Sequence, residues 1–340
     1  MTGGGTSLSV VIPTIGRETV LRTVESLLAM EGGTQCDIIV AGKIADGAVA
    51  SRLAAICAAH GNVRHLQISF ETGDSSRKKN AGAAAAQGEI VAFVDDDVVV
   101  APDWAEAMLA AFADAQVGLA SGPSLVPDDI NEVGRQAGLA LSSRAAGYVA
   151  ERYRQNAAEP YAVDWDRVIG CNAAYRREAF AEMGGFPADF YPGEEMMAAF
   201  RTERKGWKLL FVPGARVWHY PRQGVARFWR QMWGYGATRI RLIRGGVSWH
   251  PAPLVPGLWV AATLALAAAA PFSRLAALLL AADLATYAAM AWAVALETVW
   301  HTKRPGDWRV FPMILIMHAA YGLAEWRELF APGRDFSERA

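Results

Sequence analysis

The stretch GEIVAFVDDDVVVAPDW, residues 88–104, determines how the rest of the chain is interpreted. Residues Ile90 to Val94 form a short apolar run rich in β-branched side chains, which predicts a buried strand. Because side chains on a strand alternate between its two faces, Asp95 and Asp97 are expected on one side and Asp96 on the other. Two neighbouring carboxylates at the carboxyl end of a strand favour a Mg2+ or Mn2+ ion that bridges to a phosphate. A solvated acidic turn is the alternative.

The composition points to a membrane-bound part rather than to nucleic-acid binding. The 340 residues are 53% hydrophobic and their formal net charge is only -1, so no nucleic-acid partner is expected. Three widely spaced cysteines, Cys36, Cys57 and Cys171, match neither a disulfide framework nor a zinc cluster and fit a reducing compartment. The N-terminal residues lack a basic segment followed by a long apolar one, so we expect no signal peptide and a cytoplasmic N-terminal part.

Strand and helix patterns alternate over the first part of the chain. Strands are predicted at residues 8–12, 36–40, 63–68, 90–94, 117–121 and 208–212, and helices at residues 19–30, 51–60, 75–87, 104–113, 177–183 and 194–204. Residues 123–159 are interpreted as a long connection with one or two helices. The alternation predicts an α/β fold with a mostly parallel sheet and helices on both of its faces. The loops typical of dinucleotide enzymes and P-loop NTPases do not occur in the sequence.

Several short motifs follow one another in a characteristic order. They are VVIPT at residues 10–14, RKKNAG at 77–82, DDD at 95–97, GCNAAYRR at 170–177, GGF at 184–186, EE at 194–195 and VWH at 217–219. Each motif is weak alone, but their order and spacing from Leu8 to Tyr220 resemble those of the family 2 glycosyltransferases. The resemblance implies a Rossmann-like GT-A fold and the transfer of a sugar from a nucleotide-sugar donor to an acceptor.

The resemblance also implies the chemical roles of five residues. Asp95 would contact the ribose or the donor sugar, and Asp97 would hold the divalent metal, Mn2+ or Mg2+, that bridges the diphosphate. His219 is a second candidate metal ligand, and Asp95 belongs to the same candidate metal group. Glu195 would be the general base that deprotonates an acceptor hydroxyl, with Glu194 positioning the acceptor. One base and one metal suffice for a single displacement, so inversion at the sugar is expected.

Further residues are assigned to the two substrates by the same resemblance. The nucleotide-sugar side would be formed by Pro13, Thr14, Arg17, Asp46, Lys79, Asn80, Asp95 and Asp96, and the acceptor side by Gly170, Cys171, Asn172 and Trp218.

Two positions depart from the family pattern. After the second predicted strand the family has an acidic turn that reads the nucleobase, whereas this chain has VAGK at residues 40–43, with only Asp46 nearby. The nucleotide is therefore not assigned to uridine. The base position carries Glu195 where the family usually has Asp, which places the acceptor slightly further away or lets Glu194 share the role.

The C-terminal part has the pattern of a membrane protein. Between residues 205 and 282 there is no Asp or Glu, and six arginines alternate with apolar residues at helical spacing: Arg222, Arg227, Arg230, Arg239, Arg241 and Arg244. This pattern predicts a basic amphipathic helix on an anionic membrane surface, and packing on the chain's own domain is the alternative. Residues 254–272 and 275–296 are long enough to span a bilayer, the second with Asp283 paired, near an interface or functional. Residues 309–326, which contain His318, are a shorter third candidate. Basic residues on both flanks predict that both lie on the cytoplasmic side.

The expected protein is a metal-dependent, inverting glycosyltransferase of the inner membrane, with several spans and a cytoplasmic catalytic domain. We expect a GT-A domain at residues 1–221, the amphipathic surface helix at 222–250, and two or three transmembrane helices at 251–340. The expected acceptor is a hydroxyl of a lipid-linked or membrane-presented glycan, as in bacterial enzymes that extend such glycans. One alternative is transfer to a polyprenyl phosphate, which needs no base, so the acidic pair counts against it. The other is a non-catalytic membrane scaffold.

Overall fold

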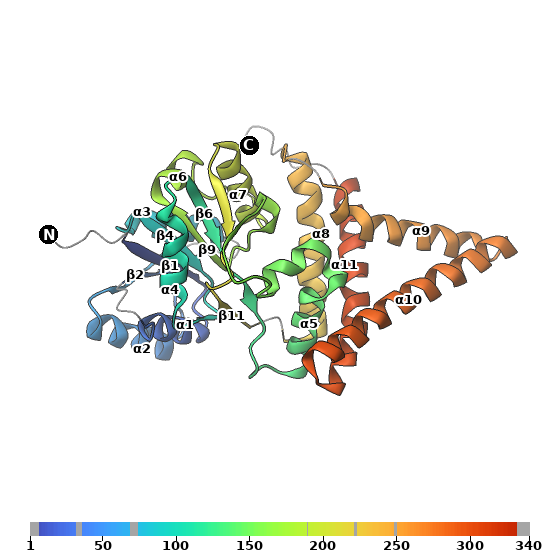
Figure 1. Ribbon diagram of the computed structural model, residues 1–340, viewed down its shortest axis with the longest axis horizontal. Coiled ribbons are helices and arrows are strands. Elements are labelled where there is room, and N and C mark those ends of the chain that lie inside the picture. Colours follow the sequence, from blue (N-terminus) through green and yellow to red (C-terminus); the bar gives the residue numbers. More distant parts are fainter. Residues whose placement is uncertain are drawn as a thin grey trace. The chain divides into compact units, whose positions relative to one another are not determined.

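The computed structural model describes residues 7–31, 36–68, 74–188, 190–220, 223–247 and 250–331 (Figure 1). The chain forms two compact units, and each is described by itself. The first unit consists of Met1–Pro127 and Glu151–Tyr220, and the second of Asp128–Ala150 and Pro221–Ala340. Most of the long connection predicted at residues 123–159 therefore belongs to the second unit.

An eight-stranded sheet forms the centre of the first unit. Its strands are β1 (Leu8–Thr14), β2 (Cys36–Gly42), β3 (Val63–Leu66), β4 (Ile90–Val94), β6 (Val117–Ser121), β8 (Tyr161–Ala162), β9 (Asn172–Arg176) and β10 (Lys208–Phe211). They lie in the order β3-β2-β1-β4-β9-β6-β10-β8. The first four of these are parallel, β9 is antiparallel to β4 and β6, and β8 is antiparallel to β10. The predicted α/β fold with a mainly parallel sheet is confirmed.

Helices pack on both faces of this sheet. They are α1 (Thr19–Leu28), α2 (Gly47–Ala59), α3 (Ser75–Ala85), α4 (Trp104–Ala110), α6 (Arg177–Glu182) and α7 (Glu194–Arg204), with short 3-10 turns at Ala111–Ala113 and Trp165–Arg167. On β1, the buried Val10 belongs to the same core cluster as Val20 of α1. Val11 points to the other face, where a Cβ added to Gly82 of α3 would come within 2.3 Å of it. Alternate side chains of one strand therefore pack against helices on opposite faces.

A three-stranded sheet, absent from the sequence prediction, joins distant parts of the first unit. It contains β5 (Val98–Val100), β7 (Ser124–Leu125) and β11 (Val217–His219), in the order β5-β11-β7. β11 is antiparallel to β5, with His219 opposite Val98, and parallel to β7. Because β5 directly follows the three aspartates, this pairing brings a late segment of the chain to the carboxyl end of β4.

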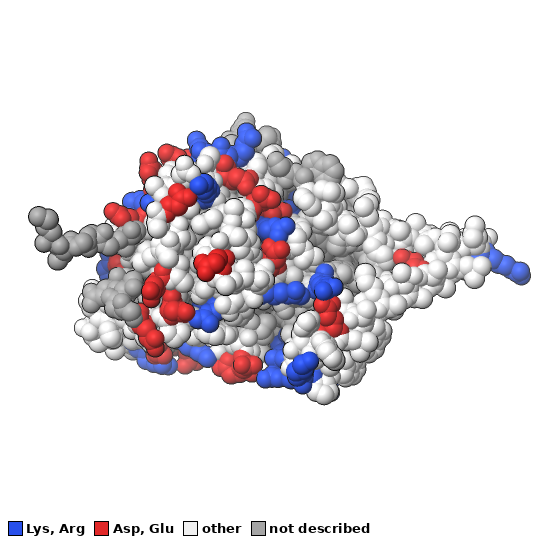
Figure 2. All heavy atoms as spheres, viewed as in Figure 1, with Lys and Arg blue, Asp and Glu red and all other residues white. Residues whose placement is uncertain are grey.

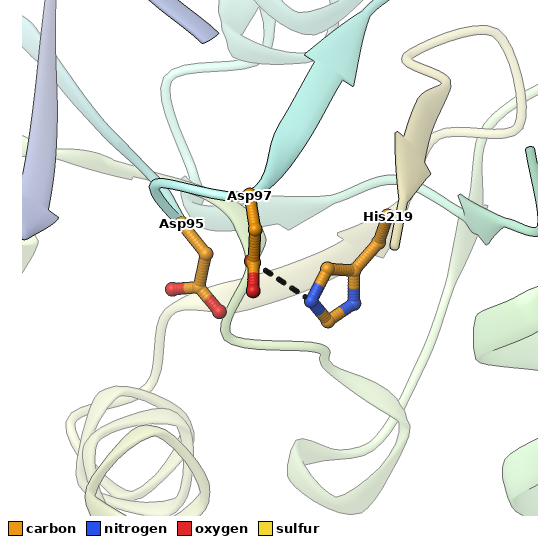
Figure 3. A group of neighbouring side chains, drawn as sticks. All are labelled: Asp95, Asp97 and His219. Atoms are coloured by element: carbon orange, nitrogen blue, oxygen red, sulfur yellow. Dashed lines mark ion pairs between the residues drawn. The ribbon is translucent and has the colours of Figure 1, made fainter. Parts of the chain in front are cut away.

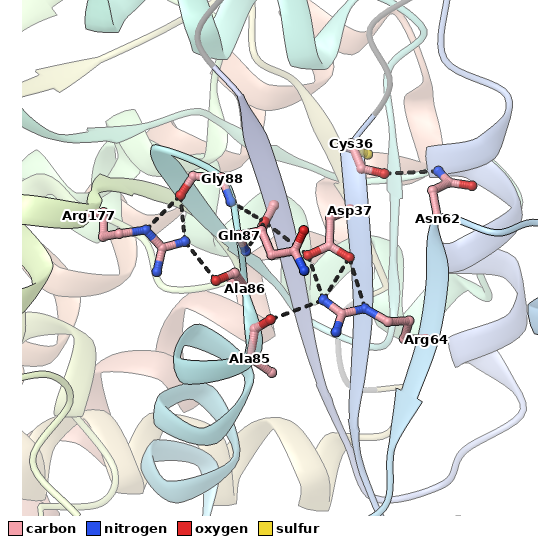
Figure 4. A network of polar contacts seen from close by, with 10 residues as sticks. Cys36, Asp37, Asn62, Arg64, Ala85, Ala86, Gln87, Gly88 and Arg177 are labelled. Atoms are coloured by element: carbon pink, nitrogen blue, oxygen red, sulfur yellow. Dashed lines mark hydrogen bonds and ion pairs between the residues drawn. The ribbon is translucent and has the colours of Figure 1, made fainter.

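Two arginines fix the C-terminal end of α3 (Figure 4). The guanidinium of Arg64 donates to the carbonyl of Ala85 at 3.0 Å and pairs with Asp37 at 2.8 Å. Arg177 donates to the carbonyl of Gly88 at 2.8 Å. The last carbonyls of a helix have no partner within the helix, so these bonds stabilise the turn from α3 into β4. Since α3 ends where β4 begins, its N-terminal lysines lie at the carboxyl end of β4.

The second unit is helical. It contains α5 (Glu132–Ser142), α8 (Val225–Arg244), α9 (Val255–Ala269), α10 (Arg274–Thr302) and α11 (Val310–Phe330), with 3-10 segments at Arg144–Tyr153, Ala252–Leu254 and Pro305–Arg309, the first of which continues into the other unit. The predicted long connection therefore does contain a helix, α5.

α8 is the basic amphipathic helix predicted from the sequence. Its backbone approaches α11 so closely that a Cβ added to Gly236 would come within 2.2 Å of the carbonyl of Tyr321. The guanidinium of Arg241 pairs with Glu328 of α11 at 2.8 Å. The apolar face of α8 is therefore covered by α11. Packing of this helix within the chain was the alternative to binding at a membrane surface. Arg227 and Arg230 are exposed, and Arg222 lies outside the described residues.

α9 and α10 form a long apolar hairpin (Figures 1 and 2). Within the described residues, two helical segments are long and apolar enough to cross a membrane, Ala252–Ala269 and Arg274–Thr302. Their large apolar side chains face outward, with Phe272 90% and Leu278 69% exposed. Asp283 is paired inside the hairpin, where the hydroxyl of Thr263 donates to its carboxylate at 2.7 Å. The two predicted apolar C-terminal helices are therefore present. α11, the third candidate, does not meet the same criteria and packs on α8 and α9.

Candidate active site

Three side chains with metal-binding atoms meet at the carboxyl end of β4 (Figure 3). One ligand atom from each of Asp95, Asp97 and His219 lies within 4.8 Å of the other two. The ring nitrogen Nε2 of His219 is 3.1 Å from Oδ1 of Asp97. Strand pairing explains this arrangement, because the amide of Tyr220 donates to the carbonyl of Asp97 at 3.2 Å and holds β11 beside the aspartates. All three groups are ligands that suit a divalent cation.

Asp96 points away from this group and joins it to the end of β1. The hydroxyl of Thr14 donates to Asp96 at 2.6 Å, and the amide of Ile15 donates to the same oxygen at 3.4 Å. Arg17 pairs with Asp97 at 2.6 Å and lies 3.6 Å from Asp96. The separation of Asp96 from its two neighbours agrees with the alternation expected from the sequence, although the three residues form a turn after β4 rather than part of it.

Burial and neighbouring charges shift the pKa values of Asp95 and His219 in the candidate metal group. Burial raises the pKa of Asp95 to about 6, with Lys79 lowering it and Asp97 raising it. Burial disfavours the charged form of His219, but contacts with Cys171 and Asp97 outweigh this and raise its pKa well above the usual value. An imidazole must be neutral to bind a metal, so a cation entering this group would displace a proton from His219.

A second cluster of charged groups is formed by the start of α7 and the start of α3. Lys79 is only 1% exposed, and its ammonium pairs with Oε1 of Glu195 and lies 3.5 Å from Oε1 of Glu194. Gly170 makes room for this pair, because a Cβ there would come within 2.3 Å of the Glu195 side chain. The cluster is electrostatically coupled to Asp95 of the metal group. The candidate metal group and the Glu194–Glu195 pair, both predicted to be catalytic, are therefore close to each other.

The two glutamates differ in proton affinity. Burial, together with the charge of Glu195, raises the pKa of Glu194 to about 7. Burial would also raise the pKa of Glu195, but the ion pair with Lys79 outweighs it and lowers that pKa. Glu195 is thus held ionised, as a proton acceptor must be, whereas Glu194 can carry a proton near neutral pH.

The remaining donor-side candidates fall into two groups. Pro13 and Thr14 lie at the carboxyl end of β1, next to Asp96. Asp46 instead caps the N-terminus of α2 by accepting from the amides of two following residues at 2.8 and 3.1 Å. The amide group of Asn80 binds the backbone of Phe186 at 2.8 and 2.9 Å. Asp46 and Asn80 are therefore engaged in local structural contacts.

The acceptor-side candidates lie in different surroundings. Gly170 contacts Glu195, and Cys171 contacts His219. Trp218 lies on β11 opposite Val99 and is partly exposed.

Asn172 is fully buried, and its side chain connects β9 to the start of α4 and to the segment between β10 and β11. Its Oδ1 accepts from the indole of Trp104 at 2.9 Å, and its Nδ2 donates to the carbonyl of Ala215 at 2.7 Å. We expect Asn172→Ala to lower the stability by about 2–4 kcal/mol, because it leaves buried donors and acceptors unpaired. Thermal unfolding measures this loss, and Asn156→Ala, at an exposed position, is the control with little expected change. Unchanged stability together with weakened acceptor binding would mean that Asn172 acts on the acceptor instead.

The fold is that of a GT-A glycosyltransferase. The sequence matches the model of the family described as "Glycosyltransferase like family 2" over residues 5–241, and the chain belongs to that family.

Two curated relatives are similar over part of the chain. The O-antigen chain rhamnosyltransferase WbaN of Salmonella anatum is 29% identical over 158 residues, which are 44% of this chain and 48% of that protein. The glucosyl-dolichyl phosphate glucuronosyltransferase of Haloferax volcanii is 22% identical over 168 residues, which are 45% of this chain and 50% of that protein. The chain spans half or less of the length of the curated relatives that it matches.

One solved structure resembles nearly the whole chain. The mannosyltransferase PcManGT from Pyrobaculum calidifontis, in complex with GDP-Man and Mn2+, superposes with a TM-score of 0.63 and 19% sequence identity. The match covers 97% of this chain and 89% of that one. At this identity the similarity establishes the fold alone.

Proposed function

We propose that the protein is a metal-dependent, inverting glycosyltransferase that moves a sugar from a nucleotide-sugar donor to a hydroxyl of a membrane-presented, lipid-linked glycan. The observation that carries the proposal is the proximity of a candidate metal group, Asp95, Asp97 and His219, to a buried acidic pair at the start of α7. The first group suits the diphosphate of a donor, and the second suits the deprotonation of an acceptor.

In this mechanism the chain's own residues supply binding and proton transfer. Asp97 and His219, with Asp95, would hold a divalent ion, and the imidazole ligand makes Mn2+ a better fit than Mg2+. When bound, the ion would neutralise the charge that develops on the departing nucleoside diphosphate. Glu195 would take the proton of the attacking hydroxyl. A single displacement of this kind inverts the configuration at the sugar.

The buried acidic pair favours a hydroxyl acceptor over a polyprenyl phosphate. A phosphate is already ionised and needs no base, so a glutamate held ionised by Lys79 would have no task there. The three metal-binding side chains Asp95, Asp97 and His219 lie together, which a non-catalytic membrane scaffold would not require. The names of the two relatives mention an O-antigen chain and a dolichyl phosphate-linked sugar, which supports a lipid-linked acceptor.

A binding panel tests the donor and metal parts of the proposal. Thermal unfolding of the purified protein is followed with several nucleoside diphosphates, each with and without Mn2+, because a ligand of the folded state raises the unfolding temperature. We expect one nucleotide to stabilise the protein, and only in the presence of metal. Transfer of sugar to a lipid-linked glycan, with product analysis for anomeric configuration, then tests the acceptor and the inversion. A metal-independent shift, or a retained configuration, would contradict the proposal.

We further propose that the protein is integral to the inner membrane, with residues 1–221 as the cytoplasmic catalytic domain and 251–340 as the membrane region. The support is the outward-facing apolar surface of the α9–α10 hairpin. Its charged groups are few: Asp283 is paired with Thr263, Arg274 stands at the start of α10, next to the hairpin turn, and Glu297 lies in the last two turns of α10.

The membrane proposal predicts resistance to washing. High salt screens charge attraction to lipids, whereas spanning helices are held by apolar burial, so the full-length protein should stay in the pellet after high-salt and carbonate washes. Immunoblotting of pellet and supernatant measures the distribution. Leu264→Arg and Leu278→Arg, both exposed on the hairpin, should increase release. Release of the parent protein by either wash would refute the spanning hairpin.

A further inference from the structure

Lys78 and Lys79 follow each other in α3, and both are buried, at 5% and 1% exposure. Consecutive residues on a helix point about 100° apart, so the two side chains meet different surroundings. The Lys79 ammonium lies between Glu194 and Glu195. Lys78 interacts electrostatically with Asp74 and Asp96, and in the part of the chain that the structure describes no hydrogen bond or ion pair reaches its ammonium.

The contacts of Lys79 leave its ammonium little room for a substrate. An ammonium has three N–H donors; one donates to Glu195, and the carboxylate of Glu194 lies 3.5 Å away as a second ion-pair partner. The remaining side faces the ring of Phe186, whose centroid is 5.1 Å from Nζ. A donor phosphate would have to displace one of the buried glutamates to reach Lys79. Lys78 is not paired with these glutamates; it interacts electrostatically with Asp96, which accepts a hydrogen bond from Thr14 at the end of β1.

We propose that Lys79 is a positioning residue that fixes the carboxylate of Glu195 for proton transfer and does not bind the donor, while its neighbour Lys78 supplies the cation on the donor side. The inference rests on the proposed function, in which Glu195 is the base. It changes the role of Lys79 expected from the sequence, where this residue stands on the nucleotide-sugar side.

The geometry around Glu195 explains how the positioning works. Lys79 engages Oε1 and thereby fixes the orientation of the Glu195 carboxylate. The side chain of Glu195 is 25% exposed, whereas that of Glu194 is 2% exposed, so only Glu195 has an open side toward an acceptor. The charged or titratable groups facing Glu195 are Lys79 from α3, Glu194 from α7, Asp95 from the turn after β4 and Tyr175 from β9. Lys79 is the one cation among them.

Matched variants of the two lysines test the proposal by kinetics. Lys79→Met should lower kcat at saturating donor by about tenfold or more, with the donor KM and metal-dependent nucleotide binding nearly unchanged. Without the cation, the pKa of Glu195 should rise, so the acid limb of the rate profile should move to higher pH. Lys78→Met should do the opposite and raise the donor KM with a smaller effect on kcat. A raised donor KM in Lys79→Met with an unmoved pH profile would overturn the proposal.

Stability provides a readout that does not depend on activity. In Lys79→Met the two buried glutamates would have folded pKa values above their unfolded ones, so stability is present at low pH and lost as pH rises through the folded values. The unfolding temperature of this variant should therefore fall more steeply between about pH 6 and pH 8 than that of the parent or of Lys78→Met. If the unfolding temperature depends on pH equally in all three proteins, Lys79 is not the counter-ion of the two glutamates.

Two further measurements distinguish a variant that does not fold from a proposed function that is wrong. If Lys79→Met does not fold, the double variant Lys79→Met/Glu194→Gln removes one charge of each sign, and the same loss of kcat with retained nucleotide binding is expected. Full activity of the double variant would overturn the positioning role. If the parent protein transfers no sugar at all, the proposed function has failed, whereas the pH dependence of stability still decides whether Lys79 is the counter-ion of the glutamates.

Discussion

Replacing Glu195 by Gln is expected to lower the transfer rate by about a hundredfold or more, while folding and donor binding are retained. Glutamine has nearly the same shape but cannot accept the acceptor's proton. The parent carboxylate is ready for this task, because the ion pair with Lys79 lowers its pKa and favours the ionised form. Single-turnover transfer with saturating donor and Mn2+ measures the effect on the chemical step.

Two further variants show whether a slow Glu195→Gln variant reflects the loss of this particular carboxylate. Glu178→Gln, at an exposed position on α6, should transfer sugar at the parental rate. Glu194→Gln should act mainly on the affinity for the acceptor. If Glu195→Gln is nearly as fast as the parent and Glu194→Gln is inactive, the two glutamates have exchanged roles. If neither variant is slow, the assignment of the base is wrong.

Asp97→Asn is expected to abolish the metal-dependent part of nucleotide binding, with a loss of affinity of at least about tenfold. Asp97 is the centre of its group, at 2.6 Å from Arg17 and 3.1 Å from His219, and the amide keeps its shape without its charge. The variant also removes one of the contacts that raise the pKa of His219. Titration calorimetry with the nucleoside diphosphate, with and without Mn2+, measures the effect.

The control for this variant is Asp37→Asn. Asp37 is also an aspartate paired with an arginine, Arg64, but it lies near the C-terminal end of α3 rather than at the metal group (Figure 4). It should leave metal and nucleotide binding unchanged. Undiminished binding and turnover in Asp97→Asn would remove this residue from the metal site.

Elements with strong local signals could be predicted from the sequence alone. The strands at 90–94 and 117–121 and the helix at 194–204 have the predicted bounds, because buried β-branched runs and flanking glycines mark their ends. The helix predicted at 51–60 begins earlier, at Gly47, since Asp46 caps it. An Asp just before an apolar helical pattern is a capping signal, so this start could have been found.

The contacts between distant segments could not be predicted in the same way. β5 and β11 have three residues each, too few for a periodic pattern, and each is stabilised by pairing with the other. The sequence places Lys78 and Lys79 side by side in a basic motif, but only the packing of α3 against α7 shows which lysine meets the glutamates. The roles that the resemblance assigns to individual site residues stay predictions until the variants are measured.

The candidate metal group is complete only when the last strand of the first unit is in place. Asp95 and Asp97 follow β4, whereas His219 arrives on β11, so the loop that the group closes is long and entropically costly to form. The binding free energy of an ion would stabilise the pairing of β11 with β5 and thereby the closed loop between Asp97 and His219. The chain enters the second unit directly after Tyr220. Loss of the ion would therefore loosen the first unit at one of the segments through which the chain continues into the second unit.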